Sequence, residues 1–136
     1  MNIRAYLWPF IILLVMAFLH ISAALYTNAY MDFWWYDVLL HFIGGLWVAS
    51  TFFWLYYEGG FAKKPKYTLA NFFLFTLGAT IVVGIAWEIF EYIFGLTYIL
   101  PGESYSIDTI CDMGMDIIGS LCVYLFYRLY FWRKFK

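Results

Sequence analysis

The chain has 136 residues, of which 65% are hydrophobic, 26% are aromatic and only 12% are charged, and its formal net charge is −1. A soluble domain is on average roughly half apolar and a quarter charged, so a soluble fold of this size could not bury so much apolar surface. The length indicates a single domain over residues 1–136. The basic residues are few and lie at the chain ends and in one loop, so we expect no nucleic-acid partner.

Four apolar stretches are each long enough to cross the hydrocarbon layer of a bilayer, which is roughly 30 Å thick. They lie at about residues 7–26, 34–57, 69–94 and 107–127. The segments between them contain residues that favour loops, among them Asn28, Pro65 and Pro101. The sequence therefore predicts an all-α membrane protein, a bundle of four transmembrane helices.

The first stretch has features of a secretory signal peptide as well as of a transmembrane helix. Arg4 precedes the apolar run, and the small residues Ser22, Ala23 and Ala24 stand near its end. We expect this stretch to remain in the protein as a true transmembrane helix.

The basic residues predict how the chain is oriented. All eight lie before the first stretch, between the second and third, or at the end of the fourth: Arg4, Lys63, Lys64, Lys66, Arg128, Arg133, Lys134 and Lys136. Lys and Arg flank transmembrane helices on the cytoplasmic side, so one orientation satisfies every helix end, with both termini in the cytoplasm (N-in/C-in). Only Glu58 of the nine acidic residues is then cytoplasmic. We expect a multi-pass protein of the plasma (inner) membrane.

Seven ionisable residues lie inside the predicted helices, toward their outer ends. They are Asp37 and His41 in the second stretch, Glu88 and Glu91 in the third, and Asp108, Asp112 and Asp116 in the fourth. Residues three or four apart share one face of a helix, so each set occupies a single face. An ionisable group in hydrocarbon costs a few kcal/mol on insertion scales and marks a functional site by default. A bundle that turns these faces inward would gather six carboxylates and one imidazole.

This cluster needs positive charge, because the outer half holds no Lys or Arg in the expected orientation. Either several carboxylates are protonated, or metal ions balance their charge. Oxygen ligands with one imidazole suit Mg²⁺, Mn²⁺, Ca²⁺, Fe²⁺ or Zn²⁺. We expect these metal ligands: His41, Glu88, Asp112 and Asp116. The remaining carboxylates are candidates for a catalytic general base or a second ligand set: Asp37, Glu91 and Asp108. One ion or two can be accommodated.

Several polar or small residues have structural interpretations of equal or greater weight. Asp32 and Glu103 can be surface acids near helix ends. His20 in the first stretch can join the cluster, although a hydrogen bond to a neighbouring residue is the interpretation that we favour. The following glycines are expected to permit close packing of helices: Gly44, Gly45, Gly84, Gly114 and Gly119.

Three motifs resemble those of a known family. They are WYDVLLHFIGG from Trp35 to Gly45, GIAWEIFEY from Gly84 to Tyr92, and DTICDMGMDIIG from Asp108 to Gly119. Together they resemble the YjdF family of small bacterial and archaeal membrane proteins. They are more distantly similar to VanZ-like proteins, which share an Asp-x-x-x-His, a later Glu and a closing Asp before a glycine. VanZ-like proteins usually also have an Arg before the last helix, which residues 97–106 lack. The resemblance implies a membrane location and a polar outer site, and no particular activity.

Two functional hypotheses follow. The first is a metal-dependent hydrolase or transferase that acts on a lipid or another amphiphilic substrate at the outer leaflet. The alternative is a protein without enzymatic activity that binds, transports or senses a divalent cation or a proton. The inner halves of the helices offer few polar groups, such as Ser50, Thr76 and Thr80, so we expect no continuous channel. A groove from the site into the outer leaflet would favour the enzyme. The oligomeric state is not predicted.

Overall fold

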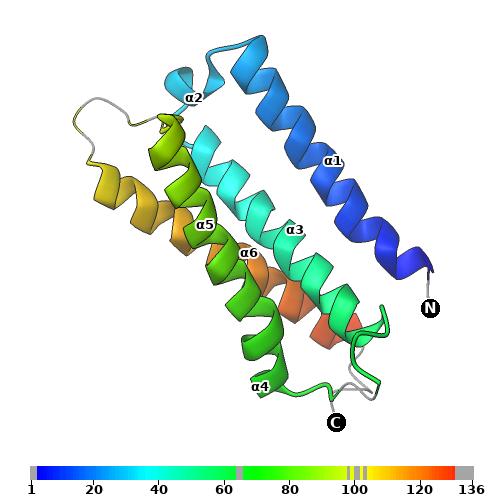
Figure 1. Cartoon of the computed structure of the whole chain (residues 1–136). Coiled ribbons are helices and arrows are strands. Elements are labelled where there is room, and N and C mark those ends of the chain that lie inside the picture. The colour runs from blue at the N-terminus through cyan, green and yellow to red at the C-terminus, as the bar shows by residue number, and fades with distance from the viewer. Residues whose placement is uncertain (1–2, 64–65, 98, 100–101, 103, 131–136) are drawn as a thin grey trace.

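The structure, a computed structural model, describes residues 3–63, 66–97, 99, 102 and 104–130. Four long helices dominate it (Figure 1): α1 (Ile3–Leu25), α3 (Tyr36–Tyr57), α5 (Gly78–Phe94) and α6 (Tyr105–Tyr130). A short helix α2 (Ala29–Asp32) follows α1, and α4 (Leu69–Phe72) leads through the π-helical turn η1 (Phe73–Leu77) into α5. No strand occurs among the described residues, and the predicted all-α fold is confirmed.

Four helical segments are long and apolar enough to cross a membrane, as the sequence predicts. They are Leu7–Leu25, Tyr36–Tyr57, Leu69–Phe94 and Tyr105–Leu129, all within two residues of the expected bounds. Local chemistry explains two of these limits. The Thr68 hydroxyl caps the third segment by accepting the backbone N–H of Asn71 at 3.2 Å. That segment ends at Gly95, whose φ of +64° is a left-handed conformation that favours glycine.

Helix α2 lies in a segment that the sequence analysis assigned to a loop. The Thr27 hydroxyl accepts the backbone N–H of Ala29 at 3.3 Å, which helps to start the helical turn. The turn buries Tyr30, and the Nδ1 atom of His20 lies 2.6 Å from the Tyr30 hydroxyl oxygen. Helix α2 therefore joins the end of α1 to the start of α3. The favoured interpretation of His20, as a hydrogen-bonding residue, is confirmed.

Helix α3 is the centre of the bundle. It packs most extensively against α6 and, on its other side, against α1, while α5 packs against both α6 and α3. The two described chain ends lie at the same end of the bundle, and α2 lies at the opposite end with the C-terminus of α5 (Figure 1). Helix α1 is exposed along most of its length, with the Phe18 side chain 70% exposed. Apolar side chains on the outside of a spanning bundle face lipid, so this exposure is expected in a membrane.

Two glycines bring α3 and α6 unusually close together. A Cβ atom on Gly45 would collide with the backbone of Asp116, and one on Gly119 would collide with the carbonyl oxygen of Phe42. Small residues at helix crossings allow this approach inside a membrane, so the prediction of close packing is confirmed at both positions. It is wrong for Gly114, whose Cβ would have no atom within 4 Å.

The half of the bundle near the chain ends has an aromatic core. It consists of Ala49, Phe53, Tyr57, Val123 and Tyr127. The rings of Phe53 and Tyr127 stack with their centroids 3.9 Å apart, which links α3 to α6. This core fixes the two helices where they carry no acidic residue or histidine, and the acidic cluster lies in the other half.

Part of the charge pattern lies outside the described residues. These are the basic residues Lys64, Arg133, Lys134 and Lys136 and the acid Glu103. The expected orientation of the termini therefore stays a prediction.

Candidate metal centre

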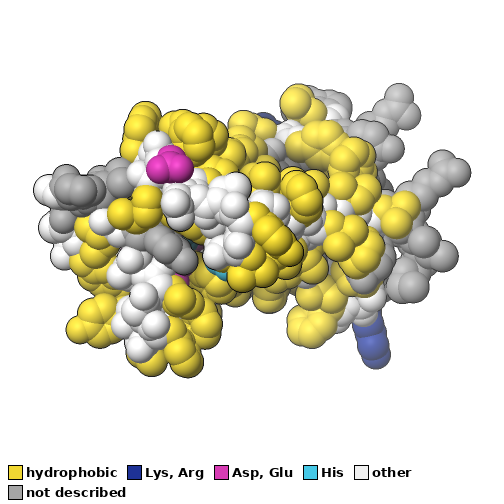
Figure 2. Space-filling view, turned by 90° about the horizontal axis from the view of Figure 1, so that it is seen from above, with side chains coloured by type: hydrophobic (Ala, Val, Ile, Leu, Met, Phe, Trp, Pro, Cys, Tyr) yellow, Lys and Arg dark blue, Asp and Glu magenta, His cyan; other side chains and the backbone are white. Residues whose placement is uncertain are grey.

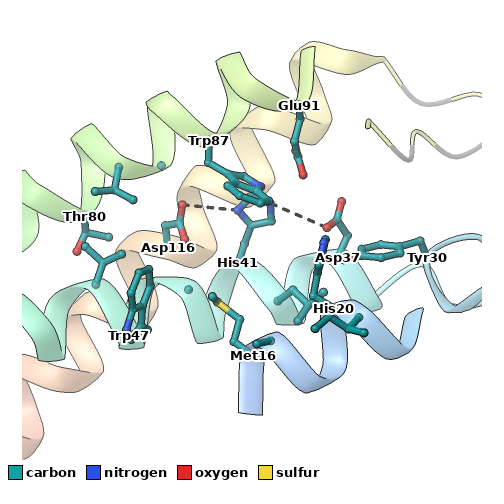
Figure 3. Close-up of a pocket in the computed structure, with 17 residues that line it drawn as sticks. Met16, His20, Tyr30, Asp37, His41, Trp47, Thr80, Trp87, Glu91 and Asp116 are labelled. Carbon is teal, nitrogen blue, oxygen red and sulfur yellow. Dashed lines mark hydrogen bonds and ion pairs between the residues drawn. The ribbon is translucent and has the colours of Figure 1, made fainter. Parts of the chain in front are cut away.

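The buried side chain of His41 is the centre of an acidic cluster. Its Nε2 atom lies 4.0 Å from Asp37 Oδ1, 4.0 Å from Glu88 Oε1 and 3.8 Å from Asp112 Oδ2. On the other side of the ring, Nδ1 lies 3.6 Å from Asp116 Oδ2. Figure 3 shows the His41 ring between the carboxylates of Asp116 and Asp37. These distances exceed those of normal hydrogen bonds, so the ring is surrounded by carboxylates without being tightly bonded to any of them.

The spacing of residues along each helix produces this cluster. Asp37 stands one helical turn before His41 on α3, and Asp112 stands one turn before Asp116 on α6. Glu88 and Glu91 come from α5, and both are buried. Six of the seven predicted site residues are thus brought together by three helices.

The seventh predicted residue, Asp108, is close enough to Asp37 and Asp112 to interact electrostatically with both, but it is not among the carboxylates that face His41 within 4.0 Å. It lies in the first turn of α6, is partly exposed, and belongs to neither group of close ligand atoms described below. Its assignment as a general base or ligand stays a prediction. Asp32 is exposed on α2, in agreement with its interpretation as a surface acid.

Two groups of three residues place their ligand atoms within 4.8 Å of one another: Asp37, His41 and Asp112, and His41, Glu88 and Glu91. Both groups share the single imidazole of His41. Carboxylate oxygens with one imidazole nitrogen are suitable ligands for the divalent ions named above. The donor set therefore fits either one ion, or two ions bridged by carboxylates.

Unpaired oxygen atoms add to the case for a cation at this position. Glu88 Oε1 and Asp112 Oδ1 are fully buried and have no hydrogen-bond partner among the described residues. A buried polar atom without a partner costs free energy, and an ionised one costs much more. A metal ion bound by either carboxylate would satisfy such an oxygen, so these two atoms are candidate ligand atoms.

The other oxygen of Glu88 is held by a residue that the sequence analysis did not select. The Thr109 hydroxyl donates a hydrogen bond of 2.7 Å to Glu88 Oε2. This bond fixes the carboxylate so that Oε1 faces His41, in the way that neighbouring residues commonly orient metal ligands. The spacing of Thr109, three residues before Asp112 on the same helix, could have indicated it.

Replacing Thr109 by Val is expected to lower metal affinity about tenfold without unfolding the protein, because valine keeps the shape and removes the donor. Thr51→Val is the matched control, since the Thr51 hydroxyl bonds to the carbonyl oxygen of Trp47 within its own helix. Competition with a chromophoric chelator measures both affinities. Equal affinity in Thr109→Val and the wild type would show that Thr109 does not position the ligand.

Two further glycines make space for the Asp116 carboxylate. A Cβ on Gly84 would lie 2.6 Å from Asp116 Oδ2, and one on Gly44 would lie 3.5 Å from Oδ1. The sequence analysis expected these glycines to bring helices together. Gly84 also faces the side chain of Met113 of α6, so it serves both purposes.

Buried hydroxyl groups continue from Asp116 toward the other end of the bundle. Thr76, Thr80 and Ser120 are at most 1% exposed, and Thr80 donates a hydrogen bond to the Thr76 carbonyl oxygen at 3.1 Å. The hydroxyl oxygens of Thr76 and Ser120 have no hydrogen-bond partner among the described residues. The fully buried rings of Phe53 and Phe72 come next along α3 and the third span. The polar groups thus give way to packed rings about two to three helical turns beyond Asp116.

A cavity of about 320 Å³ adjoins the cluster between α1, α3 and α5. Four ionisable site residues line it, namely Asp37, His41, Glu91 and Asp116, and most of its other lining residues are apolar. Figure 2 shows a hollow at one end of the molecule with a histidine side chain visible inside it. Sites for small molecules typically occupy roughly 300–1,000 Å³, so the cavity is large enough for a ligand beside the acidic cluster.

Comparison with other proteins identifies a family and no individual relative. No curated protein and no solved structure shows a significant match to the chain. A family model described as "Predicted membrane protein (DUF2238)" matches residues 2–133, nearly the whole chain. Together with the four apolar helices, this match shows that the chain is a membrane protein and belongs to that family.

Proposed function

We propose that the protein is a metal-dependent hydrolase or transferase embedded in the membrane, which acts on a lipid or lipid-linked substrate at the outer leaflet. One observation carries the proposal. A buried histidine is surrounded by buried carboxylates, two of whose oxygens have no hydrogen-bond partner within the described part of the chain, and a largely apolar cavity lies beside them. Among the residues that the structure describes, no Lys or Arg lines that cavity. The charge of the cluster is then balanced either by protonation of several carboxylates or by a bound cation, and the proposal takes the cation.

The ligand set assigns chemical roles to the residues. His41 Nε2, Glu88 and Asp112 would hold a divalent ion, which would polarise an ester or phosphoryl oxygen and activate water. Asp116, on the Nδ1 side of the imidazole, would orient that ring or hold a second ion. Asp37 and Glu91 line the cavity, where a carboxylate can accept the proton of the attacking water. In hydrolysis the water oxygen bonds to the carbonyl carbon or phosphorus, the bond to the leaving oxygen breaks, and the proton passes to that oxygen.

A second candidate function is binding, transport or sensing of a divalent cation or proton without catalysis. The buried hydroxyls of Thr76 and Ser120 favour it, because they extend the polar region beyond Asp116. The packed rings of Phe53 and Phe72 argue against a continuous path through the bundle. The cavity beside the cluster favours the enzyme, since a site used only for sensing needs no space for a substrate.

Elemental analysis of the detergent-purified protein is the experiment that tests the metal site. We expect stoichiometric metal in the wild type, and release of product from phospholipid or isoprenoid phosphate substrates that stops when a chelator removes the metal. Bound metal without turnover of any substrate would support the second candidate. Absence of metal after incubation with Mg²⁺, Mn²⁺, Zn²⁺ and Ca²⁺ would overturn the proposal and leave a protonated cluster.

We also propose that the protein lies in the plasma membrane and that its likeness to YjdF and VanZ-like proteins reflects a shared outer site. In the proposed orientation both termini are cytoplasmic. The distribution of Lys and Arg supports the orientation. In a variant with both native cysteines replaced by Ser, Asn28→Cys should react with a membrane-impermeant maleimide on intact cells. Lys63→Cys should react only after the cells are lysed. The reverse pattern would show that the orientation is inverted.

A further inference from the structure

The cavity has the length of one leaflet of a bilayer. Its lining along α3 extends from Asp37 to Val48. At about 1.5 Å per residue, the eleven steps between these residues correspond to roughly 16 Å along the helix. The hydrocarbon layer of a membrane is roughly 30 Å thick, so the cavity is about as long as half of it.

The lining suits an amphiphile. Asp37, Glu91 and the neighbouring residues of the acidic cluster make the wall near α2 polar. The wall formed by α1 includes Met16, Ala17 and Ile21, which are apolar. A ligand with a polar group at one end and a hydrocarbon chain at the other matches this distribution.

The cavity opens sideways, between α1 and α5. Helix α1 packs against α3 and α2 and makes no extensive contact with α5. Ile21 of α1 and Trp87 of α5 both line the cavity, and their side chains are 49% and 41% exposed. Figure 3 shows Trp87 on one side of the cavity, with Met16 and His20 of α1 on the other. In a membrane this opening faces lipid.

We propose that the cavity holds one hydrocarbon chain of a membrane lipid, which enters between α1 and α5 and places its polar group beside the acidic cluster. The position of the polar group rests on the proposed function, whereas the chain site does not. The negative charge of the cluster limits which polar groups can bind beside it. Because no described Lys or Arg lines the cavity, a phosphate beside the carboxylates requires a bound metal ion, and an uncharged glycerol does not.

The test fills the cavity with a larger side chain. In Val83→Trp the indole occupies the cavity that Val83 lines. Val82→Trp is the matched control, because the neighbouring Val82 is 67% exposed and does not line the cavity. The delipidated proteins are incubated with dioleoylglycerol or dioleoylphosphatidylglycerol, with and without metal, and bound lipid is counted by native mass spectrometry. Val83→Trp should bind either lipid about tenfold less tightly than the wild type and Val82→Trp.

A second pair of variants changes residues of α1, which forms another wall of the cavity. Ala17→Phe should also weaken lipid binding, and Val15→Phe, at an exposed position outside the lining, should not. Equal binding of dioleoylglycerol by the wild type and both cavity-filling variants, or no binding by the wild type, would overturn the chain site. Metal content is measured on the same samples. If dioleoylglycerol binds while the samples incubated with metal retain none, the chain site would be kept and the metal centre rejected, so the two proposals fail separately.

Discussion

Exchanging Asp112 for Asn and Glu88 for Gln in one variant is expected to lower metal affinity by at least about 100-fold. Both residues have a buried oxygen that no described residue hydrogen-bonds, and both face the Nε2 atom of His41. The amides keep the volume of the carboxyl groups and remove two negative charges from the centre of the cluster. Metal content of the purified variant and titration with the metal found in the wild type measure the effect.

The same variant separates a lost metal site from a lost fold. Removal of two closely spaced acids relieves repulsion in the metal-free protein, so the metal-free variant should resist denaturant at least as well as the metal-free wild type. Asp32→Asn is the control, because Asp32 is exposed on α2 and should leave metal affinity unchanged. Unchanged metal content in the double variant would exclude Asp112 and Glu88 as ligands. Loss of metal in Asp32→Asn as well would show that net charge, and not the cluster, governs binding.

The spacing of ionisable residues was enough to predict most of the site. Asp37 and His41, and likewise Asp112 and Asp116, stand one helical turn apart, which places each pair on one face whatever the packing. The cost of such groups in hydrocarbon then requires these faces to meet inside the bundle. The helical repeat and the length of each span are enough to place these pairs, and both can be read from the sequence.

What the sequence did not predict depends on how neighbouring helices cross. Thr109 bonds to Glu88 only because the first turns of α6 lie against the last turns of α5. Gly114 and Gly119 look alike in the sequence, yet Gly119 meets the backbone of α3 and Gly114 meets nothing. The cavity likewise results from the separation of α1 and α5, which no local pattern encodes. Pairwise packing, and not periodicity, decides these features.

Gly119→Ala is expected to destabilise the protein by about 3 kcal/mol or more, a large effect for the addition of one methyl group. The new Cβ would collide with the carbonyl oxygen of Phe42 and would lie 2.8 Å from the backbone nitrogen of Leu46. Both atoms belong to the backbone of α3, so no side chain can move aside. Helices α3 and α6 must separate, and unfolding in mixed detergent followed by circular dichroism measures the loss.

Gly114→Ala provides a control with the same chemical change on the same helix. Its Cβ would have no neighbour within 4 Å, and alanine favours a helix over glycine by roughly 1 kcal/mol, so this variant should be as stable as the wild type or slightly more stable. Similar losses in both variants would mean that glycine is needed in α6 for another reason than close packing.

Metal affinity should fall in Gly119→Ala and stay unchanged in Gly114→Ala, as stability does. The reason is that the contact at Gly119 also positions His41 relative to the carboxylates of α6. Phe42, which Gly119 touches, follows His41 directly, and the backbone of Asp116 packs on Gly45. A separation of α3 from α6 therefore moves the imidazole away from Asp112 and Asp116 at the same time. If Gly119→Ala folds and binds metal with unchanged affinity, His41 cannot be a ligand together with the α6 carboxylates. The metal centre would then have to be formed either by His41 with Glu88 and Glu91, or by α5 and α6 without His41.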